Sequence, residues 1–147
     1  MSTTRQSPIV VGVDGSGSSL DAVGWAAHAA ELRGVPVKLV SAYQVKVLYT
    51  SFVALPSHIG SEEHKAAESV LAWASLVARR SVKDPDGLEI VSESIVGPTI
   101  QAMLEQSSSA SMMVVGSRGN GDYFAELLGS VSTAVAVQAH CPVVIVP

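Results

Sequence analysis

Glycine, serine and one arginine gather in a single stretch, GSRGNGDYFAELLGS at residues 116–130, directly after the apolar run SMMVV. Glycine costs conformational entropy on folding, so four of them after a predicted strand need a reason. Backbone N–H groups without a shielding side chain can approach a phosphate, and a serine that caps a helix can donate to it. The spacing Gly116-x2-Gly119-x9-Gly129-Ser130 therefore predicts an anion-binding loop, with a plain turn and a helix capped by Ser130 as the alternative.

Three familiar active-site loops do not fit the sequence. No glycine is followed by lysine, which excludes a P-loop. Gly15-x-Gly17 is followed by Leu20, and the stretch SAYQ lacks the acidic residue that holds a ribose in dinucleotide folds. No G-x-S-x-G elbow is present, and no general base stands beside the glycine loop. We expect a binding module; the alternatives are a slow ATPase or phosphotransferase that uses Asp14 to hold a metal, and a non-binding dimeric scaffold.

Strands and helices alternate along the chain and would position this loop. Apolar runs predict five strands, and helical spacing predicts helices between them. This alternation predicts an α/β fold: one domain over residues 1–147, with an open parallel five-stranded sheet, helices on both faces and the Rossmann-like strand order 3-2-1-4-5. The predicted strands are residues 8–13, 35–43, 88–96, 111–115 and 142–146; helices cover 19–33 and begin near 61, 98 and 130; residues 44–60 are predicted to be a long surface loop.

In this strand order, the loops after the first and fourth strands face each other at the carboxyl edge of the sheet, where such folds bind ligands. The composition agrees with a sheet covered on both faces, since 48% of the residues are hydrophobic and only 5% are aromatic. A formal net charge of -4 without a Lys/Arg run argues against nucleic-acid binding. One cysteine, no secretory signal and no membrane-length apolar run predict a cytoplasmic protein.

The glycine spacing resembles the nucleotide-binding signature of the universal stress protein family. VVGVDGSGSSLDAVGWAAHAA is similar to the family's first strand, turn and helix, and MMVVGSRGNG and LLGSVSTAVAVQAHCPVVIVP are similar to its last third. The resemblance covers nearly the whole chain and is weakest between residues 44 and 65. It implies a stress-response protein that binds an adenine nucleotide, ATP or cAMP.

The resemblance also implies which residues contact the nucleotide. Asp14 would approach the nucleoside, although capping of the first helix, by Asp14 or by Ser16, is an equal alternative. Backbone groups around Ser41 and Ala42 would face the adenine edge, and the glycine loop would hold the phosphate. The predicted contact residues are Asp14, Ser16, Ala42, Val115, Gly116, Arg118, Gly119, Gly129, Ser130, Val131 and Ser132.

The charge of this loop bears on the choice of nucleotide. Arg118 is its only cation, and Asp122 and Glu126 are nearby acids. A triphosphate would need a divalent ion such as Mg²⁺, whereas the single charge of a cyclic nucleotide could be met by amides, one arginine and a helix end. ATP and cAMP both remain open.

The histidines near residue 60 and the last predicted strand bear on metal binding and on association. His58 and His64 flank IGSEE, but their spacing matches no metal-ligand motif, so we expect a solvated loop. The last predicted strand, PVVIV, would lie at a sheet edge without charge to protect it, which favours pairing with a second copy. The family resemblance agrees, and we expect a homodimer through this strand.

Overall fold

The computed structural model describes residues 6–45, 49–50, 53–54, 59–118 and 128–147. Strands and helices alternate, as the sequence predicts. The main sheet contains β1 (Ile9–Gly12), β2 (Val37–Tyr43), β5 (Ile90–Val96), β6 (Met112–Gly116) and β7 (Val143–Val146), and the helices are α1 (Gly17–Arg33), α2 (Ile59–Arg80), α3 (Thr99–Ser107) and α4 (Ser130–Gln138). A short 3-10 turn covers Pro85–Gly87.

The five-stranded sheet is parallel throughout, with the order β5-β2-β1-β6-β7. This is the predicted order 3-2-1-4-5, which is confirmed. β1 lies in the middle, where Ile9 pairs with Val37 of β2 on one side and with Met112 of β6 on the other. The chain therefore reverses its direction of travel across the sheet at β1, and the carboxyl ends of β1 and β6 lie next to each other.

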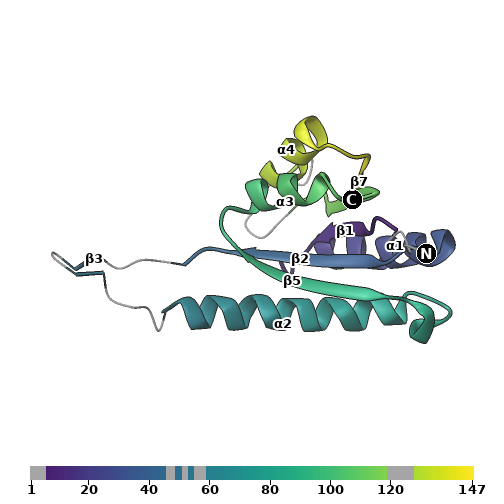
Figure 1. Ribbon diagram of the computed structural model, residues 1–147, viewed down its shortest axis with the longest axis horizontal. Coiled ribbons are helices and arrows are strands. Elements are labelled where there is room, and N and C mark those ends of the chain that lie inside the picture. The colour runs from purple at the N-terminus through teal and green to yellow at the C-terminus, as the bar shows by residue number, and fades with distance from the viewer. Residues whose placement is uncertain (1–5, 46–48, 51–52, 55–58, 119–127) are drawn as a thin grey trace, which may run out of the picture.

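Helices cover both faces of the sheet (Figure 1). α1 and α2 pack side by side on one face, and α3 and α4 pack on the other. Two buried clusters fill the layers, because successive strand residues point to opposite faces. Ile9, Val11 and Leu39 belong to the cluster under α1 and α2, whereas Val10, Val40 and Met103 belong to the cluster under α3 and α4.

Local sequence explains where α1 begins and ends. The hydroxyl oxygen of Ser16 accepts a hydrogen bond from the backbone N–H of Ser19 at 3.2 Å, which caps the first turn. Gly34 follows the last helical residue with φ +65°, a left-handed conformation that glycine adopts without a steric penalty. Between these caps, buried alanines such as Ala22, Ala26 and Ala30 let the helix lie close to the sheet.

The prediction for residues 44–60 was partly wrong. β3 (Tyr49–Thr50) and β4 (Val53–Ala54) pair antiparallel in a small separate sheet, which lies away from the main one (Figure 1). α2 also begins at Ile59, two residues before the predicted start. Two-residue strands are too short for an alternating pattern, so the sequence carries no signal for them.

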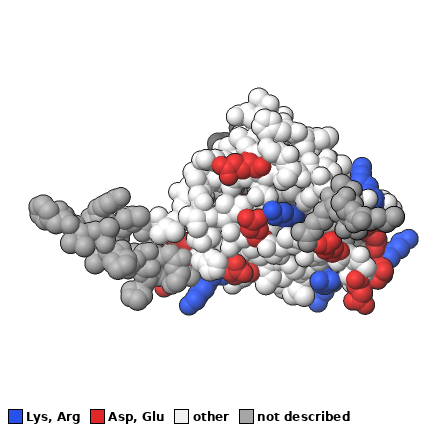
Figure 2. Space-filling model, viewed as in Figure 1, with Lys and Arg blue, Asp and Glu red and all other residues white. Residues whose placement is uncertain are grey.

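Charged side chains of both signs are interspersed on the face shown in Figure 2, and neither sign forms a large patch there. One ion pair, at 2.7 Å, joins Lys38 of β2 to Glu93 of β5. Within the described residues, no helix is long and apolar enough to cross a membrane.

Candidate functional site

A pocket of about 220 Å³ opens at the carboxyl edge of the sheet, where β1 and β6 end side by side. This is the position that the strand order predicts for a ligand. Its walls come from segments far apart in the sequence: both strand ends, the end of β2 and the first turns of α1, α3 and α4. The lining residues are Gly12, Val13, Asp14, Ser19, Val40, Ala42, Thr99, Met103, Val115, Gly116, Arg118, Gly129, Ser130, Val131 and Ser132.

The turn between β1 and α1 holds Asp14 at the pocket. Gly15 takes a φ of +85°, and the backbone N–H of Ser16 donates to Oδ1 of Asp14 at 2.9 Å. The backbone N–H of Asp14 in turn points to Oγ of Ser19 at 3.4 Å. Of the two candidates, Ser16 and not Asp14 is the N-cap of α1. The Asp14 carboxylate instead accepts a hydrogen bond within the turn just before the helix.

The two ends of the glycine-rich segment are joined by backbone hydrogen bonds. Gly129 donates to the carbonyl of Ser117 at 2.7 Å, and Ser117 donates to the carbonyl of Val146 at 2.8 Å. Gly116 packs against α1: a Cβ at this position would lie 2.7 Å and 2.8 Å from the carbonyl carbon and oxygen of Ser18. Glycine is therefore required at residue 116 by the close approach of strand and helix.

The start of α4 differs from the prediction in one respect. Gly129, and not Ser130, is the N-cap, and no side chain caps this helix. Ser130 is the first helical residue and is exposed, so its hydroxyl does not satisfy the helix end. Ser132 is buried, and its hydroxyl lies 2.9 Å from the carbonyl of Gly129 and 3.2 Å from that of Ser117, to which it can donate. The first residues of α4 line the pocket, and among the described residues no side chain caps the N–H groups of this helix end.

The lining of the pocket is partly apolar and partly polar. Its apolar side chains come from the ends of β1, β2 and β6, from α3 and from the first turn of α4: Val13, Val40, Ala42, Met103, Val115 and Val131. The rest of the described lining is hydroxyls, glycine backbone and two charged side chains, Asp14 and Arg118, which are the only charged groups among these residues. Three helices begin at this pocket, and each contributes a partial positive charge from its N-terminus. Such a site suits a ligand with a flat apolar part and an anionic part.

The structure brings nearly all the predicted contact residues to this one pocket. Ser16 is the exception, because its side chain caps α1, and Gly119 lies outside the described residues. Six lining residues were missed by sequence reasoning: Gly12, Val13, Ser19, Val40, Thr99 and Met103. Thr99 could have been predicted to line the pocket, because it follows Gly97-Pro98 at the predicted start of a helix at the same edge of the sheet.

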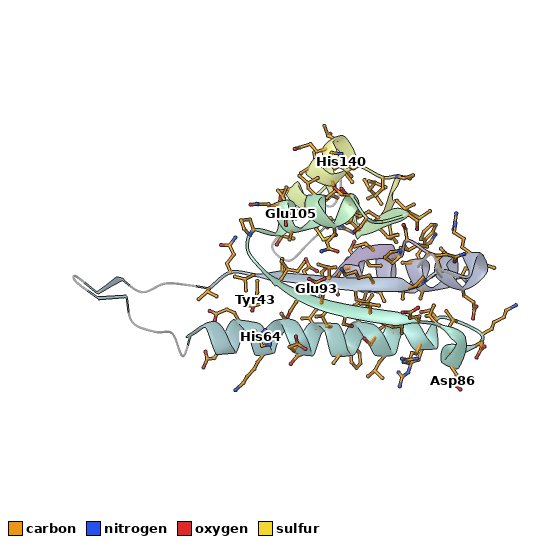
Figure 3. All side chains as sticks on the ribbon, viewed as in Figure 1. Tyr43, His64, Asp86, Glu93, Glu105 and His140 are labelled. Atoms are coloured by element: carbon orange, nitrogen blue, oxygen red, sulfur yellow. The ribbon has the colours of Figure 1, made fainter. Side chains whose placement is uncertain are left out.

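No metal centre is found among the described residues, where no group of three or more His, Cys, Asp or Glu side chains comes together. His58 lies outside the described part of the chain. Nδ1 of His64 lies 3.2 Å from the hydroxyl of Tyr43, and Nε2 lies 3.8 Å from the Glu68 carboxylate. Figure 3 shows Tyr43 and His64 facing each other between β2 and α2. This histidine therefore helps to join α2 to the sheet.

Cys141 belongs to the packing of the molecule. Its half-buried side chain lies against the cluster under α3 and α4. Burial raises the pKa of the Cys141 thiol, partly offset by a hydrogen bond from the backbone of Met113. The thiol thus stays protonated at neutral pH.

The fold and the pocket together define a parallel α/β domain with a pocket at the switch point of its sheet. The model of the universal stress protein family matches residues 7–147, and the chain belongs to that family. A universal stress protein of Mycobacterium tuberculosis is 34% identical over 138 residues, and one of Mycobacterium bovis is 32% identical over 142 residues. These matches cover 94% and 97% of this chain but only 46% and 48% of the relatives, so the chain spans about half of their length.

Solved structures of the family have the same fold. A universal stress protein crystallised in complex with cAMP is 27% identical, with a TM-score of 0.73 over 98% of this chain and 99% of that one. A universal stress protein from Archaeoglobus fulgidus in complex with dAMP is 25% identical, with a TM-score of 0.73 over 98% and 100% of the two chains.

Proposed function

We propose that this protein binds an adenine nucleotide in the pocket at the carboxyl edge of the sheet and acts in a stress response through its occupancy. The observation that carries the proposal is a pocket lined by both apolar side chains and the N-termini of three helices. We place the base beside Ala42 and Val115, and the phosphate at the start of α4 beside Gly129 and Ser130. The cAMP and dAMP complexes of two family members support this ligand class.

The ligand we propose is ATP or cAMP. Arg118 is the only cation that lines the described pocket, so a triphosphate leaves several negative charges to be met by amides and by a divalent ion. The protein would offer Mg²⁺ one carboxylate, Asp14, and the nucleotide phosphates would supply the other charged ligands. A cyclic phosphodiester needs no metal. Titration calorimetry with ATP plus Mg²⁺, and separately with cAMP, distinguishes the two.

Replacement of Gly129 tests the phosphate site directly. Gly129→Glu places a carboxylate at the start of α4, where like-charge repulsion is expected to weaken nucleotide binding at least about a hundredfold. Gly129 has a φ of -64°, which any residue adopts, so its backbone conformation does not exclude a side chain. Gly129→Gln is the matched control, with the same size and no charge. Unchanged affinity in Gly129→Glu would contradict the proposed phosphate site.

We also propose that two copies associate through the free edge of β7 and that the protein acts in the cytoplasm. β7 pairs with β6 alone in the described part of the chain. The lone thiol, Cys141, suits a reducing compartment.

A further inference from the structure

Met103 and Gly12 share one space in the wall of the pocket. The Met103 side chain extends from α3 to the end of β1 and is only 1% exposed. A Cβ at residue 12 would lie 2.9 Å from the terminal methyl of Met103 and 3.1 Å from its sulfur. The thioether therefore occupies the volume that the missing side chain of Gly12 leaves open.

Close packing closes the remaining sides of this thioether. Met103 belongs to a cluster whose buried members are all at most 3% exposed: Val10, Val40, Met113, Val115 and Val135. A packed interior has no room for a displaced side chain. Both Met103 and Gly12 also line the pocket, which is the open volume next to them. Any change that moves the thioether away from residue 12 therefore moves it into the pocket.

The chemistry of methionine suits this position. Its unbranched side chain rotates about three bonds and fills irregular gaps, and its sulfur makes favourable contacts with aromatic rings. Val40 and Ala42 of β2 and Val115 of β6 complete an apolar slot around it. We infer that Met103, packed into the space beside Gly12, sets the size of the nucleobase that the pocket accepts; this inference rests on the proposed function.

Shortening Met103 should widen the slot. We measure by calorimetry the binding of ATP plus Mg²⁺ and of cAMP, each unmodified and with a benzyl group at N6 or a phenyl group at C2 or C8. In Met103→Ala, the affinity of at least one bulky analogue relative to the unmodified nucleotide is expected to rise about tenfold or more. Met103→Val is the second variant, which keeps more of the core filled. Met112→Ala is the matched control, because Met112 packs on the opposite face of the sheet.

Gly12→Ala should have the opposite effect by pushing the thioether into the slot. The affinity for the unmodified nucleotide is expected to fall about tenfold, the effect of one extra carbon in a tight apolar pocket. In the Met103→Ala background the same change should cost at most about twofold, because the displaced group is gone. Equal losses in both backgrounds would mean that the new methyl blocks the pocket by itself, and would overturn the role of Met103.

The outcomes separate this inference from the proposed function. If the unchanged protein binds neither ATP nor cAMP, the proposed function fails and the inference fails with it. If the unchanged protein binds nucleotide but neither Met103 variant gains relative affinity for any bulky analogue, the inference alone is overturned. A gain that Met112→Ala shows equally would also overturn it.

Discussion

At Gly116 the backbone of β6 lies close to α1. A Cβ there would meet the carbonyl group of Ser18 at 2.7–2.8 Å, and helix backbone cannot move aside as a flexible side chain can. We expect Gly116→Ala to lower the free energy of unfolding by about 1–3 kcal/mol, measured by denaturant unfolding. Gly17→Ala is the control, since a Cβ at this helical residue meets nothing within 4 Å. Equal stability of the two variants would contradict the contact.

Among the residues that line the pocket, most glycines and polar residues could be predicted from the sequence, whereas several apolar residues could not. Gly129 and Ser130 could be predicted because their spacing from Gly116 and Gly119 is unusual for a plain turn. Val40 and Met103 line the same pocket, but in the sequence they have the pattern of core residues, which they also are. Burial and ligand contact demand the same side chains at the apolar end of such a site. The cap of α4 was misassigned because Gly129 and Ser130 are adjacent and both are common at N-caps.

At the scale of elements, Glu31 joins α1 to the turn that follows α2. Its two carboxylate oxygens accept backbone N–H groups, from Asp84 at 2.9 Å and from Lys83 at 3.1 Å. These hydrogen bonds lower the pKa of Glu31 below its ordinary value of 4.5, and the bond from Asp84 has the larger effect. A lowered folded-state pKa means that this stabilisation is present above about pH 4.5 and is lost as the pH falls through the folded-state pKa.

The Glu31→Gln variant tests this linkage. The glutamine side chain has one oxygen and no charge. One of the two backbone N–H groups therefore loses its acceptor, and the other donates to a neutral oxygen in place of a charged one. We expect a lower melting temperature than that of the unchanged protein at pH 7, with the difference shrinking as the pH is lowered from 4.5. The exposed Glu89, next to β5, provides the control variant Glu89→Gln. A difference that stays constant down to pH 3 would show that the carboxylate charge plays no part.

The order of the strands and helices could be predicted from the sequence, whereas some of the residues at which they begin and end could not. Buried strands such as β1 and β6 are runs of Val, Ile and Met bounded by polar turns, and between them helical spacing is clear, so alternation and a parallel sheet could be inferred. β5 alternates more than the others and does lie at an edge. β3 and β4 have two residues each, too few for a pattern of period two.

At the scale of the whole molecule, the free edge of β7 makes the proposed dimer testable. The carbonyl of Pro142 accepts a hydrogen bond from Met113 of β6, and that of Val146 accepts one from Ser117, directly after β6. The N–H groups of Val143 and Ile145 therefore point away from the sheet. Residues 128–147 contain no Lys, Arg, Asp or Glu to oppose association. This edge can therefore pair with a second copy.

Val143→Pro removes one outward N–H group while the hydrogen bonds to β6 remain. We expect the unchanged protein to sediment at twice its 15.2 kDa mass and this variant to shift toward the monomer. Ser92→Pro makes the same change at the opposite edge, on β5, and should leave the dimer intact. A dimer equally stable in Val143→Pro would place the association elsewhere.

The central position of β1 has a consequence for how the protein is made. Ile9 pairs with Met112, and the pocket needs Asp14 together with Ser130. A ribosome must therefore synthesise the chain from residue 9 to beyond residue 130 before these walls can meet, and α4 is the last of them to emerge. The nucleotide that we propose would therefore stabilise this domain only after α4 has been synthesised.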